Sequence, residues 1–282
     1  MGALRPIEVG AKRLWTNGAW SASMLLASWR EPPAAEFCRK FEAEAYVPEK
    51  LVRVLPGLNV IYLVVPKAAN TRIRAILATI GRRYSRQLWP SRWGKLREPQ
   101  GPRSMTARSF YRLATSPTTF RFSFVRNPYT RLLSCWADKF QGRPLVPGLP
   151  EIDDYLVRRK RIDSSLPFGP NTTLSFDRFV TFAAASLDME HDLHLHRQDD
   201  LLSVPAIAPN FIGRVESFNT DFAKVLDRLG ASDEVRREAL VPLNTSRHEL
   251  CSDHYTPPMA DCVYRAYERD FDRFGYPRSL PS

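Results

Sequence analysis

A lysine and several small residues separate an apolar segment from an amphipathic one in "YLVVPKAANTRIRAILATIG", residues 62–81. Lys67 follows the apolar segment, and Ala68, Ala69 and Asn70 are small enough to let a ligand approach the backbone. The start of a helix offers unpaired N–H groups and the positive end of the helix dipole, and a nearby ammonium adds a full charge. The stretch therefore predicts an anion site at the turn between the two segments.

A second candidate anion site lies in "FRFSFVRNPYTRLLSCWADKF", residues 120–140. Arg126 ends an apolar run directly before an Asn-Pro helix start. Arg131 and Ser134 are three positions apart, so they share one face of the following helix, away from its apolar stripe. An arginine can hold a phosphate through two parallel hydrogen bonds, and a serine hydroxyl can add a third. Two anion sites on two turns suit a ligand with anionic groups at opposite ends.

Several common motifs are absent from the sequence. There is no G-x-x-x-x-G-K-[ST], which disfavours a triphosphate P-loop, and no G-x-G-x-x-G. The four cysteines are scattered without the CxxC spacing of a zinc or redox site, and we expect no metal site.

Both candidate sites require a strand before the turn and a helix after it. Residues 59–65, "NVIYLVV", are rich in branched side chains, as in a strand buried on both faces. From Ile73 onward, apolar residues recur at i, i+3, i+4 and i+7, which predicts a helix that Asn70 or Thr71 caps and Gly81 ends.

The second and third units repeat this order. Residues 120–125 are predicted to form a strand, with Asn127 as N-cap and Pro128 as first residue of the next helix. A third strand is predicted at 211–215 and its helix at 219–229. The alternation favours an α/β fold with a mainly parallel sheet. Further helices are predicted within residues 31–46, at about 175–185, and from about Pro258 to residues 269–277.

Composition limits the class of protein. The 282 residues, 44% of them hydrophobic, can form one large domain with a proper core. Lys and Arg total 41 against 30 Asp and Glu, a net charge of +11, which favours anionic partners without choosing among nucleic acid, nucleotide, acidic glycan and membrane surface. Basic runs at 82–108 and 158–161 are solvated faces or contacts for an acidic acceptor. No apolar run approaches the ~20 residues of a membrane span.

Five stretches resemble the sulfotransferases, in the order found in that family. "VPKAANTRIRAIL" resembles the loop that binds the 5′-phosphosulfate, and "FVRNPYTRLLSCWADKF" resembles the motif that binds the 3′-phosphate. The likeness continues through "DLHLHRQDDLL", "FIGRVESFNTDFAKVLDRLG" and "YRAYERDFDRFGYP". It is closest to the carbohydrate sulfotransferases of the chondroitin, dermatan and HNK-1 type, sulfotransferase family 2, in a soluble, bacterial-like form.

The resemblance implies a P-loop-like, three-layer α/β fold with a central, mainly parallel sheet between helices. It covers residues 58–277 as the sulfotransferase domain and leaves 1–57 as an N-terminal extension, packed on the core or loosely attached to it. The implied donor is 3′-phosphoadenosine-5′-phosphosulfate. Its implied contacts are Lys67, Ala68, Ala69, Asn70, Thr71 and Arg72 at the 5′ end, and Arg126 and Ser134 at the 3′-phosphate.

Three positions depart from the family pattern. Ala69 replaces a common glycine and Asn127 a common aspartate, both small changes that leave donor binding credible. Leu195 and Arg197 stand where a Trp and a Pro are usual, near the acceptor side.

The resemblance also implies the roles of two catalytic residues. Lys67 and the loop N–H groups would stabilise charge on the leaving oxygen during in-line transfer. His194 would act as general base, since a histidine is mostly neutral near pH 7, with His196 as the alternative. Both rings could instead only pack and cap this loop. Glu216 is expected to be a structural partner for a helix start or an arginine, and it becomes the candidate base if neither histidine serves.

The expected acceptor is a hydroxyl, most readily on a carbohydrate, and the sequence does not identify it or the oligomeric state. A non-catalytic binder of acidic glycan or nucleic acid, or a nucleotide-dependent kinase, are the alternative functions. No nucleic-acid partner is expected. We expect a cytoplasmic protein, or a Golgi-lumenal one if the chain lacks its native anchor.

Overall fold

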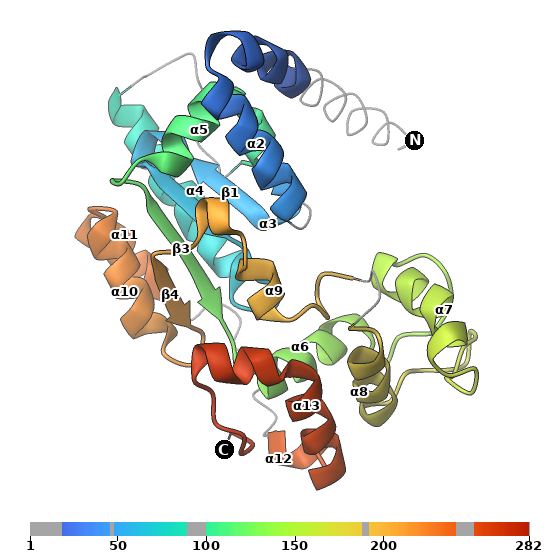
Figure 1. Cartoon of the computed structure of the whole chain (residues 1–282). Coiled ribbons are helices and arrows are strands. Elements are labelled where there is room, and N and C mark those ends of the chain that lie inside the picture. Colours follow the sequence, from blue (N-terminus) through green and yellow to red (C-terminus); the bar gives the residue numbers. More distant parts are fainter. Residues whose placement is uncertain (1–18, 46–47, 89–99, 188–191, 241–250, 282) are drawn as a thin grey trace, which may run out of the picture.

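A four-stranded sheet forms the centre of the computed structural model, which describes residues 19–45, 48–88, 100–187, 192–240 and 251–281 (Figure 1). The strand order is β1-β2-β3-β4. β2 and β3 are parallel, as are β3 and β4, whereas β1 pairs with β2 antiparallel. The strands are β1 (Val52–Leu55), β2 (Val60–Leu63), β3 (Phe120–Val125) and β4 (Phe211–Arg214). The predicted α/β class with a central, mainly parallel sheet is confirmed.

The three predicted strands are all present, and β3 has the predicted bounds. Every residue of β2 is buried, as its run of branched side chains indicated. β1 was not predicted, and it lies before the boundary expected at residue 58. Its four residues include Arg53, so it lacks the apolar run that identifies β2.

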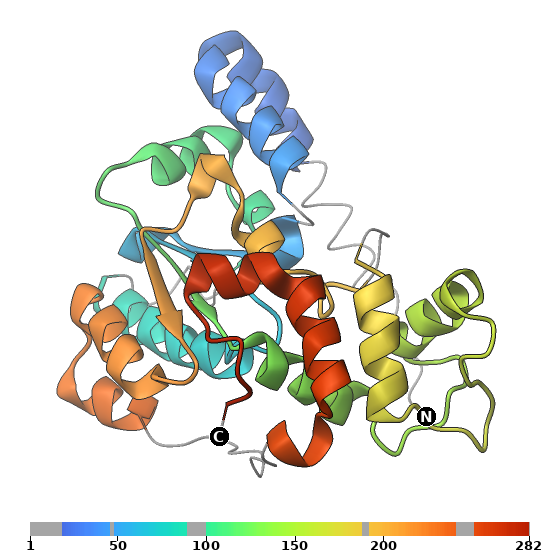
Figure 2. The same ribbon diagram turned by 60° about the horizontal axis from the view of Figure 1, so that its bottom comes forward.

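Helices cover both faces of the sheet. On one side lie α4 (Asn70–Leu88), α10 (Phe218–Arg228) and α11 (Asp233–Leu240); on the other lies α5 (Ala107–Thr115), against which α2 (Pro32–Glu44) packs (Figure 2). The three-layer arrangement therefore follows the expectation. Short helical segments complete this half of the molecule: residues 19–30, α3 (Pro48–Leu51), η1 (Pro56–Leu58), η3 (Pro102–Ser104) and η4 (Pro205–Ile207).

A second group of helices lies beyond the carboxyl ends of the parallel strands, where the tip of β3 points in Figure 1. These helices pack on one another, with α13 against α6, α8 and α9. They are α6 (Pro128–Lys139), α7 (Pro150–Ile162), α8 (Phe176–Ala185), α9 (Gln198–Leu202), α12 (Cys251–His254) and α13 (Pro257–Phe274).

The predicted end of α4 at Gly81 is wrong, because the helix continues to Leu88. Gly81 is buried within the helix, and a single interior glycine costs only about 1 kcal/mol. Beyond it Arg83 bonds Glu234 at 2.6 Å and Glu238 at 3.3 Å, both on α11. These ion pairs support the extra turns.

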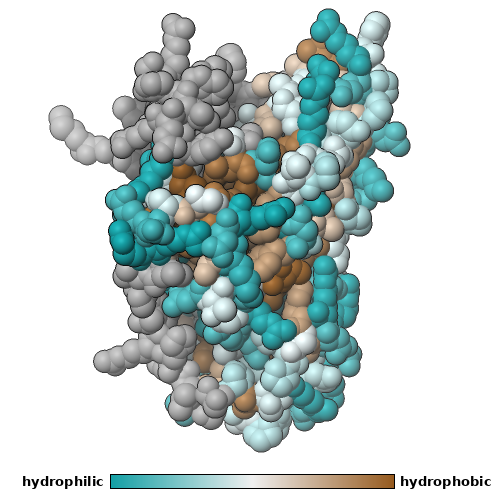
Figure 3. Space-filling view, turned by 90° about the vertical axis from the view of Figure 1, so that its left-hand side faces the viewer, coloured by the Kyte–Doolittle hydropathy of each residue, from teal (hydrophilic) through white to brown (hydrophobic). Residues whose placement is uncertain are grey.

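The sheet is packed with aromatic side chains. Tyr62 stacks on Phe122 across β2 and β3, and Phe124 contacts Phe218 and Phe222 of α10. On the side of α10 and α11, the surface shows apolar areas between hydrophilic side chains (Figure 3). Among the described residues, no helix combines the length and apolar character that crossing a membrane requires.

Candidate active site

The turn between β2 and α4 has an unusual backbone. Lys67 has φ 67° and Ala69 has φ 57°, and Ala68 between them has negative φ. Alternation of this kind makes backbone N–H groups converge into an anion-binding concavity, or nest. Residues with a Cβ rarely adopt positive φ, so two such residues within three positions indicate backbone strain. Strain of this kind is concentrated at functional sites of proteins.

The start of α4 lies directly at this turn. Asn70 is already helical and the first helical hydrogen bond runs from Ile73 N to Ala69 O at 3.0 Å, so the prediction that Asn70 or Thr71 is the N-cap is wrong. The N–H groups of Asn70 and Thr71 precede that bond and point out of the helix start. The side-chain oxygen of Asn70 is buried and has no partner among the described residues. The N–H groups of the turn are donors that a bound anionic ligand can accept from, whereas the Asn70 oxygen would need a donor.

Lys67 is held between two parts of the chain. Its side chain is 16% exposed, and Nζ lies 3.1 Å from Asp138 Oδ2 in the last turn of α6. Its backbone oxygen accepts a hydrogen bond from Arg126 Nη1 at 3.4 Å. The two predicted anion-binding turns are therefore adjacent.

Arg126 directly follows the last residue of β3, and it is half-buried. Its Nε donates to Thr130 Oγ1 at 3.0 Å, and its backbone N–H and C=O both bond the side-chain amide of Gln198. Burial lowers the pKa of Arg126 from its usual value, although the guanidinium stays charged at neutral pH. Asn127 is the predicted N-cap, since its Oδ1 accepts from Tyr129 N at 2.9 Å. A half-buried guanidinium at a helix start that makes two hydrogen bonds to described residues has donors left for a phosphate.

Arg131 differs from the expectation of a polar helix face. It is 1% exposed, because Nε bonds Pro66 O at 3.0 Å and Nη1 bonds His196 O at 2.8 Å. It therefore ties the first turn to the loop before α9, while Nη2 has no partner in the described part of the chain. Ser134 on the same helix is half-buried, and its hydroxyl makes no hydrogen bond to the residues that are described.

The guanidinium of Arg72 is directed toward α10 and α11. It lies 4.2 Å above the Phe218 ring, and Nη2 donates to Ala239 O at 2.9 Å. Contact of Arg72 with the 5′ end of a donor stays a prediction, in which its backbone N–H is the available group.

His194 and Asp192 form a hydrogen-bonded pair, with Nδ1 and Oδ2 2.8 Å apart. Each side chain is 24% exposed. Burial by itself would raise the pKa of Asp192, but the hydrogen bond and charge of His194 outweigh it, and the pKa is lowered. The ligand atoms of His194, Asp192 and Glu151 at the start of α7 lie within 4.8 Å of one another. A carboxylate on Nδ1 orients the ring and leaves Nε2 as the nitrogen that can face a substrate.

Lys139 connects this pair to Lys67. Its Nζ lies 2.9 Å from Glu151 Oε1 and 3.4 Å from Asp138 Oδ2. We call the six residues of this network the charged cluster: Lys67, Asp138, Lys139, Glu151, Asp192 and His194.

The thiol of Cys135 on α6 is buried. Burial raises its pKa to about 12, and the charge of Asp192 adds to that rise while Lys67 and Lys139 oppose it. The structure brings Lys67 and His194, 127 positions apart in the chain, to the same region.

The alternative bases have different surroundings. His196 is 5% exposed and its backbone oxygen is bound by Arg131. Glu216 accepts from the Asn127 backbone N–H at 2.7 Å and from Tyr276 Oη at 3.0 Å. The expectation that Glu216 is a structural partner of a helix start is confirmed.

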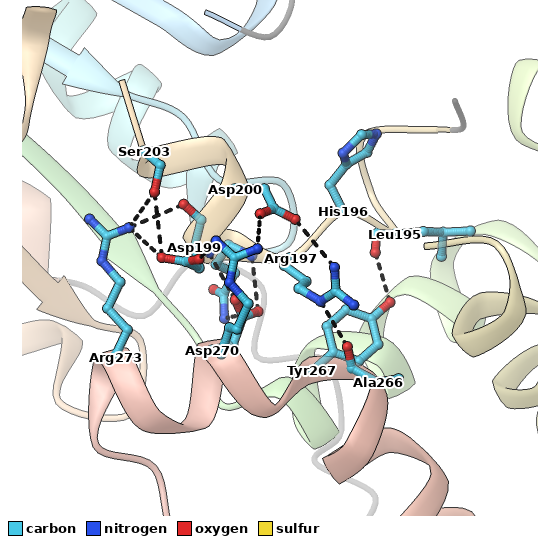
Figure 4. A network of polar contacts seen from close by, with 12 residues as sticks. Leu195, His196, Arg197, Asp199, Asp200, Ser203, Ala266, Tyr267, Asp270 and Arg273 are labelled. Carbon is cyan, nitrogen blue, oxygen red and sulfur yellow. Dashed lines mark hydrogen bonds and ion pairs between the residues drawn. The ribbon is translucent and has the colours of Figure 1, made fainter. Parts of the chain in front are cut away.

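Helix α13 fixes the loop that carries the histidines (Figure 4). Tyr267 has non-helical angles, φ −113° and ψ 20°, and its hydroxyl donates to Leu195 O at 2.7 Å. Next to this kink, Ala266 O accepts from Arg197 Nε at 2.9 Å. Buried Asp270 accepts from the backbone N–H groups of Gln198 and Asp199, so it caps α9. Since Gln198 also bonds Arg126, α13 positions the loop relative to the second turn.

Three residues of the cluster were missed by the sequence prediction. Asp138 and Lys139 fall inside the quoted "WADKF", and their place in the last turn of α6, opposite Lys67, could have drawn attention to them. Glu151 carries no such signal, because α7 itself was not predicted.

Comparisons with known proteins identify the family and several relatives of this chain. The model of the sulfotransferase family matches residues 51–277. Carbohydrate sulfotransferase 10 of Danio rerio is 25% identical over 245 residues, which are 78% of this chain and 64% of that protein. The Xenopus laevis protein of the same name is 26% identical, over 77% of this chain and 65% of its own length.

A third relative covers less of the chain. Carbohydrate sulfotransferase 14 of Danio rerio is 29% identical over 175 residues, 56% of this chain and 44% of that protein. The chain therefore spans less than two thirds of the length of these relatives. No solved structure gives a significant match.

Proposed function

The chain belongs to the sulfotransferase family, and we propose that it transfers the sulfuryl group of 3′-phosphoadenosine-5′-phosphosulfate to a carbohydrate hydroxyl. The observation that carries this proposal is the 3.4 Å contact between Arg126 Nη1 and Lys67 O. It joins two helix-start turns, each with a cationic side chain, into one region that accommodates a ligand with two anionic ends.

The donor supplies an activated sulfuryl group and a nucleotide bisphosphate leaving group. The donor groups available to hold it have spare hydrogen-bonding capacity: the guanidinium of Arg126, the Ser134 hydroxyl and the N–H groups at the start of α4. Arg126, in the second turn, and Ser134, on the helix α6 that follows this turn, are assigned to the 3′-phosphate. The nest at Lys67–Ala69 and the ammonium of Lys67 are assigned to the 5′ end.

Lys67 supports transfer by stabilising negative charge on the leaving oxygen. Its side chain is only 16% exposed, so its charge is poorly screened by water. His194 takes the proton from the acceptor hydroxyl at Nε2, because Asp192 occupies Nδ1. The carboxylate then stabilises the imidazolium that forms. Lys67 and His194 thus act on opposite sides of the transferred group.

A carbohydrate acceptor is supported by the names of the three relatives, all called carbohydrate sulfotransferases. The acceptor must approach His194, so we assign acceptor binding to the region around α7 and the loop before α9. The net charge of +11 suits an acidic glycan.

Calorimetric titration with adenosine 3′,5′-bisphosphate tests this function at the donor site. We expect binding by the wild type and weakening by roughly ten-fold or more in Arg126→Ala, since one charge-assisted contact contributes about 1.5–3 kcal/mol. Arg121→Ala is the matched control, because Arg121 lies at the opposite end of β3 and bonds Ala208 O and Ala114 O. A wild type that does not bind the bisphosphate, or an Arg126→Ala variant with unchanged affinity, would contradict the assignment.

A further inference from the structure

We propose that Asp138 is a positioning residue for Lys67, a resident counter-ion that the 5′ end of the nucleotide must displace. This inference rests on the proposed function and deepens it. It assigns a role in nucleotide entry and release to a carboxylate at the end of α6.

The first argument is the geometry of the ion pair. Lys67 Nζ and Asp138 Oδ2 are 3.1 Å apart, and no other carboxylate in the described ranges lies within ion-pair distance of Lys67. The lysine stem rises from a backbone fixed at positive φ, whereas the carboxylate is 49% exposed. The same ammonium is the group that would face the 5′ end of the donor. The carboxylate and the ligand therefore compete for one cation.

The second argument is that Asp138 can release Lys67 without losing all its countercharge. Lys139 Nζ lies 3.4 Å from the same oxygen, Oδ2, and its own second partner is Glu151 at 2.9 Å. When Lys67 turns toward an incoming anion, Lys139 stays beside Asp138. An arrangement with two ammonium groups around one carboxylate makes the exchange reversible.

The third argument excludes a role for Asp138 as the base. Although burial by itself would raise the pKa of Asp138, Lys67 and Lys139 hold it below its usual value. A carboxylate whose pKa is lowered is a poorer acceptor for a hydroxyl proton. His194, which has a carboxylate partner on Nδ1, is better suited.

The consequence is measurable as tighter nucleotide binding when the competitor is removed. Asp138→Asn keeps the size of the side chain and removes its charge. Because the pair is partly exposed, we expect the affinity for adenosine 3′,5′-bisphosphate to rise only about two- to five-fold. The donor KM should fall while kcat does not rise, since the product nucleotide then leaves more slowly.

The decisive experiment is a double-mutant cycle on the full chain. Calorimetry with adenosine 3′,5′-bisphosphate is carried out on the wild type, Asp138→Asn, Lys67→Ala and the double variant, with folding checked by circular dichroism. We expect the gain from Asp138→Asn to disappear in the Lys67→Ala background, and Asp138→Glu to restore wild-type affinity. Asp227→Asn controls for net charge, because Asp227 is an exposed carboxylate paired with Arg236 on the α10–α11 side.

Unchanged or weaker binding by Asp138→Asn would overturn the inference, as would an equal gain in Asp227→Asn or in the Lys67→Ala background. These outcomes leave the proposed function intact if the wild type binds the bisphosphate. A wild type that does not bind it would overturn the proposed function itself.

Discussion

At the scale of single residues, His194 and His196 differ in what surrounds them. His194 is partly exposed and paired with Asp192 at 2.8 Å. His196 is 5% exposed, and Arg131 binds its backbone oxygen. A base must reach a substrate, so the more exposed His194 is the better candidate.

This difference predicts unequal effects of two substitutions. His194→Ala should lose about 10²–10⁴-fold in kcat with bisphosphate affinity intact, whereas His196→Ala should lose far less. His254→Ala is a matched control, since that ring packs against Trp136 and Phe176. Steady-state transfer rates and nucleotide titrations distinguish the outcomes. If both variants stay folded and active within a few-fold, neither histidine is the base.

Residue types and spacing predicted only part of the candidate site. Lys67, Arg126 and His194 stand out because each lies next to a turn or within a motif that resembles a known family. Asp138 and Glu151 do not, since isolated acidic residues on helices are usually solvated. Their significance depends on tertiary contacts with Lys67, Lys139 and the histidine loop.

At the scale of elements, the turn between β2 and α4 carries backbone strain at Lys67 and Ala69. Ala69 has φ 57° where the resembling family commonly has glycine. A Cβ in the left-handed region costs about 1–2 kcal/mol. Replacing Ala69 with glycine therefore tests whether the turn is strained.

Ala69→Gly should relieve that strain and raise the free energy of unfolding. The gain is limited to about 1 kcal/mol, because glycine also gains entropy in the unfolded chain, which acts in the opposite direction. Nucleotide affinity should change little, since the backbone keeps the same conformation. Chemical denaturation of both proteins measures the difference. Ala68→Gly, at negative φ, is the control and should destabilise; a destabilised Ala69→Gly variant would contradict the strain at this turn.

Elements with a continuous apolar pattern were predicted and those without one were missed. β3 has an apolar run, and α6 has an Asn N-cap and Pro at its first helical position, so the bounds of β3 and the start of α6 were predicted correctly. α7 buries only Ile152, Tyr155 and Arg159 among many charges, and its stripe is too weak to recognise. α5 lies beside a basic, Pro-containing segment that concealed its short apolar repeat.

At the scale of the whole molecule, the sheet brings two distant turns together and α13 returns at the end of the chain to fix the histidine loop. The order of the elements is implied by alternating strands and helices. The contact between α13 and the histidine loop is not implied by that alternation, because Asp270 and Tyr267 form hydrogen bonds with backbone groups of that loop and of α9.

The arrangement of Glu151, Asp192 and His194 around Lys139 also predicts whether transfer depends on a metal ion. Glu151, Asp192 and His194 could offer three ligands to a cation, but Lys139 already bonds Glu151 and supplies positive charge there. Transfer should therefore be unchanged after treatment with a chelator and dialysis. Loss of activity that a divalent cation restores would instead assign these three side chains to a metal site.

The most direct test of sulfuryl transfer is a single-turnover measurement with radiolabelled 3′-phosphoadenosine-5′-phosphosulfate and a mixture of glycan acceptors. The wild type should transfer label, and Lys67→Ala should slow the transfer step by roughly 10²–10³-fold, as for loss of one charge-stabilising donor, while bisphosphate affinity falls much less. Lys224→Ala, which removes an exposed ion pair with Asp221, should leave the rate unchanged. Wild-type transfer by a folded Lys67→Ala variant would contradict the role of this lysine at the leaving group.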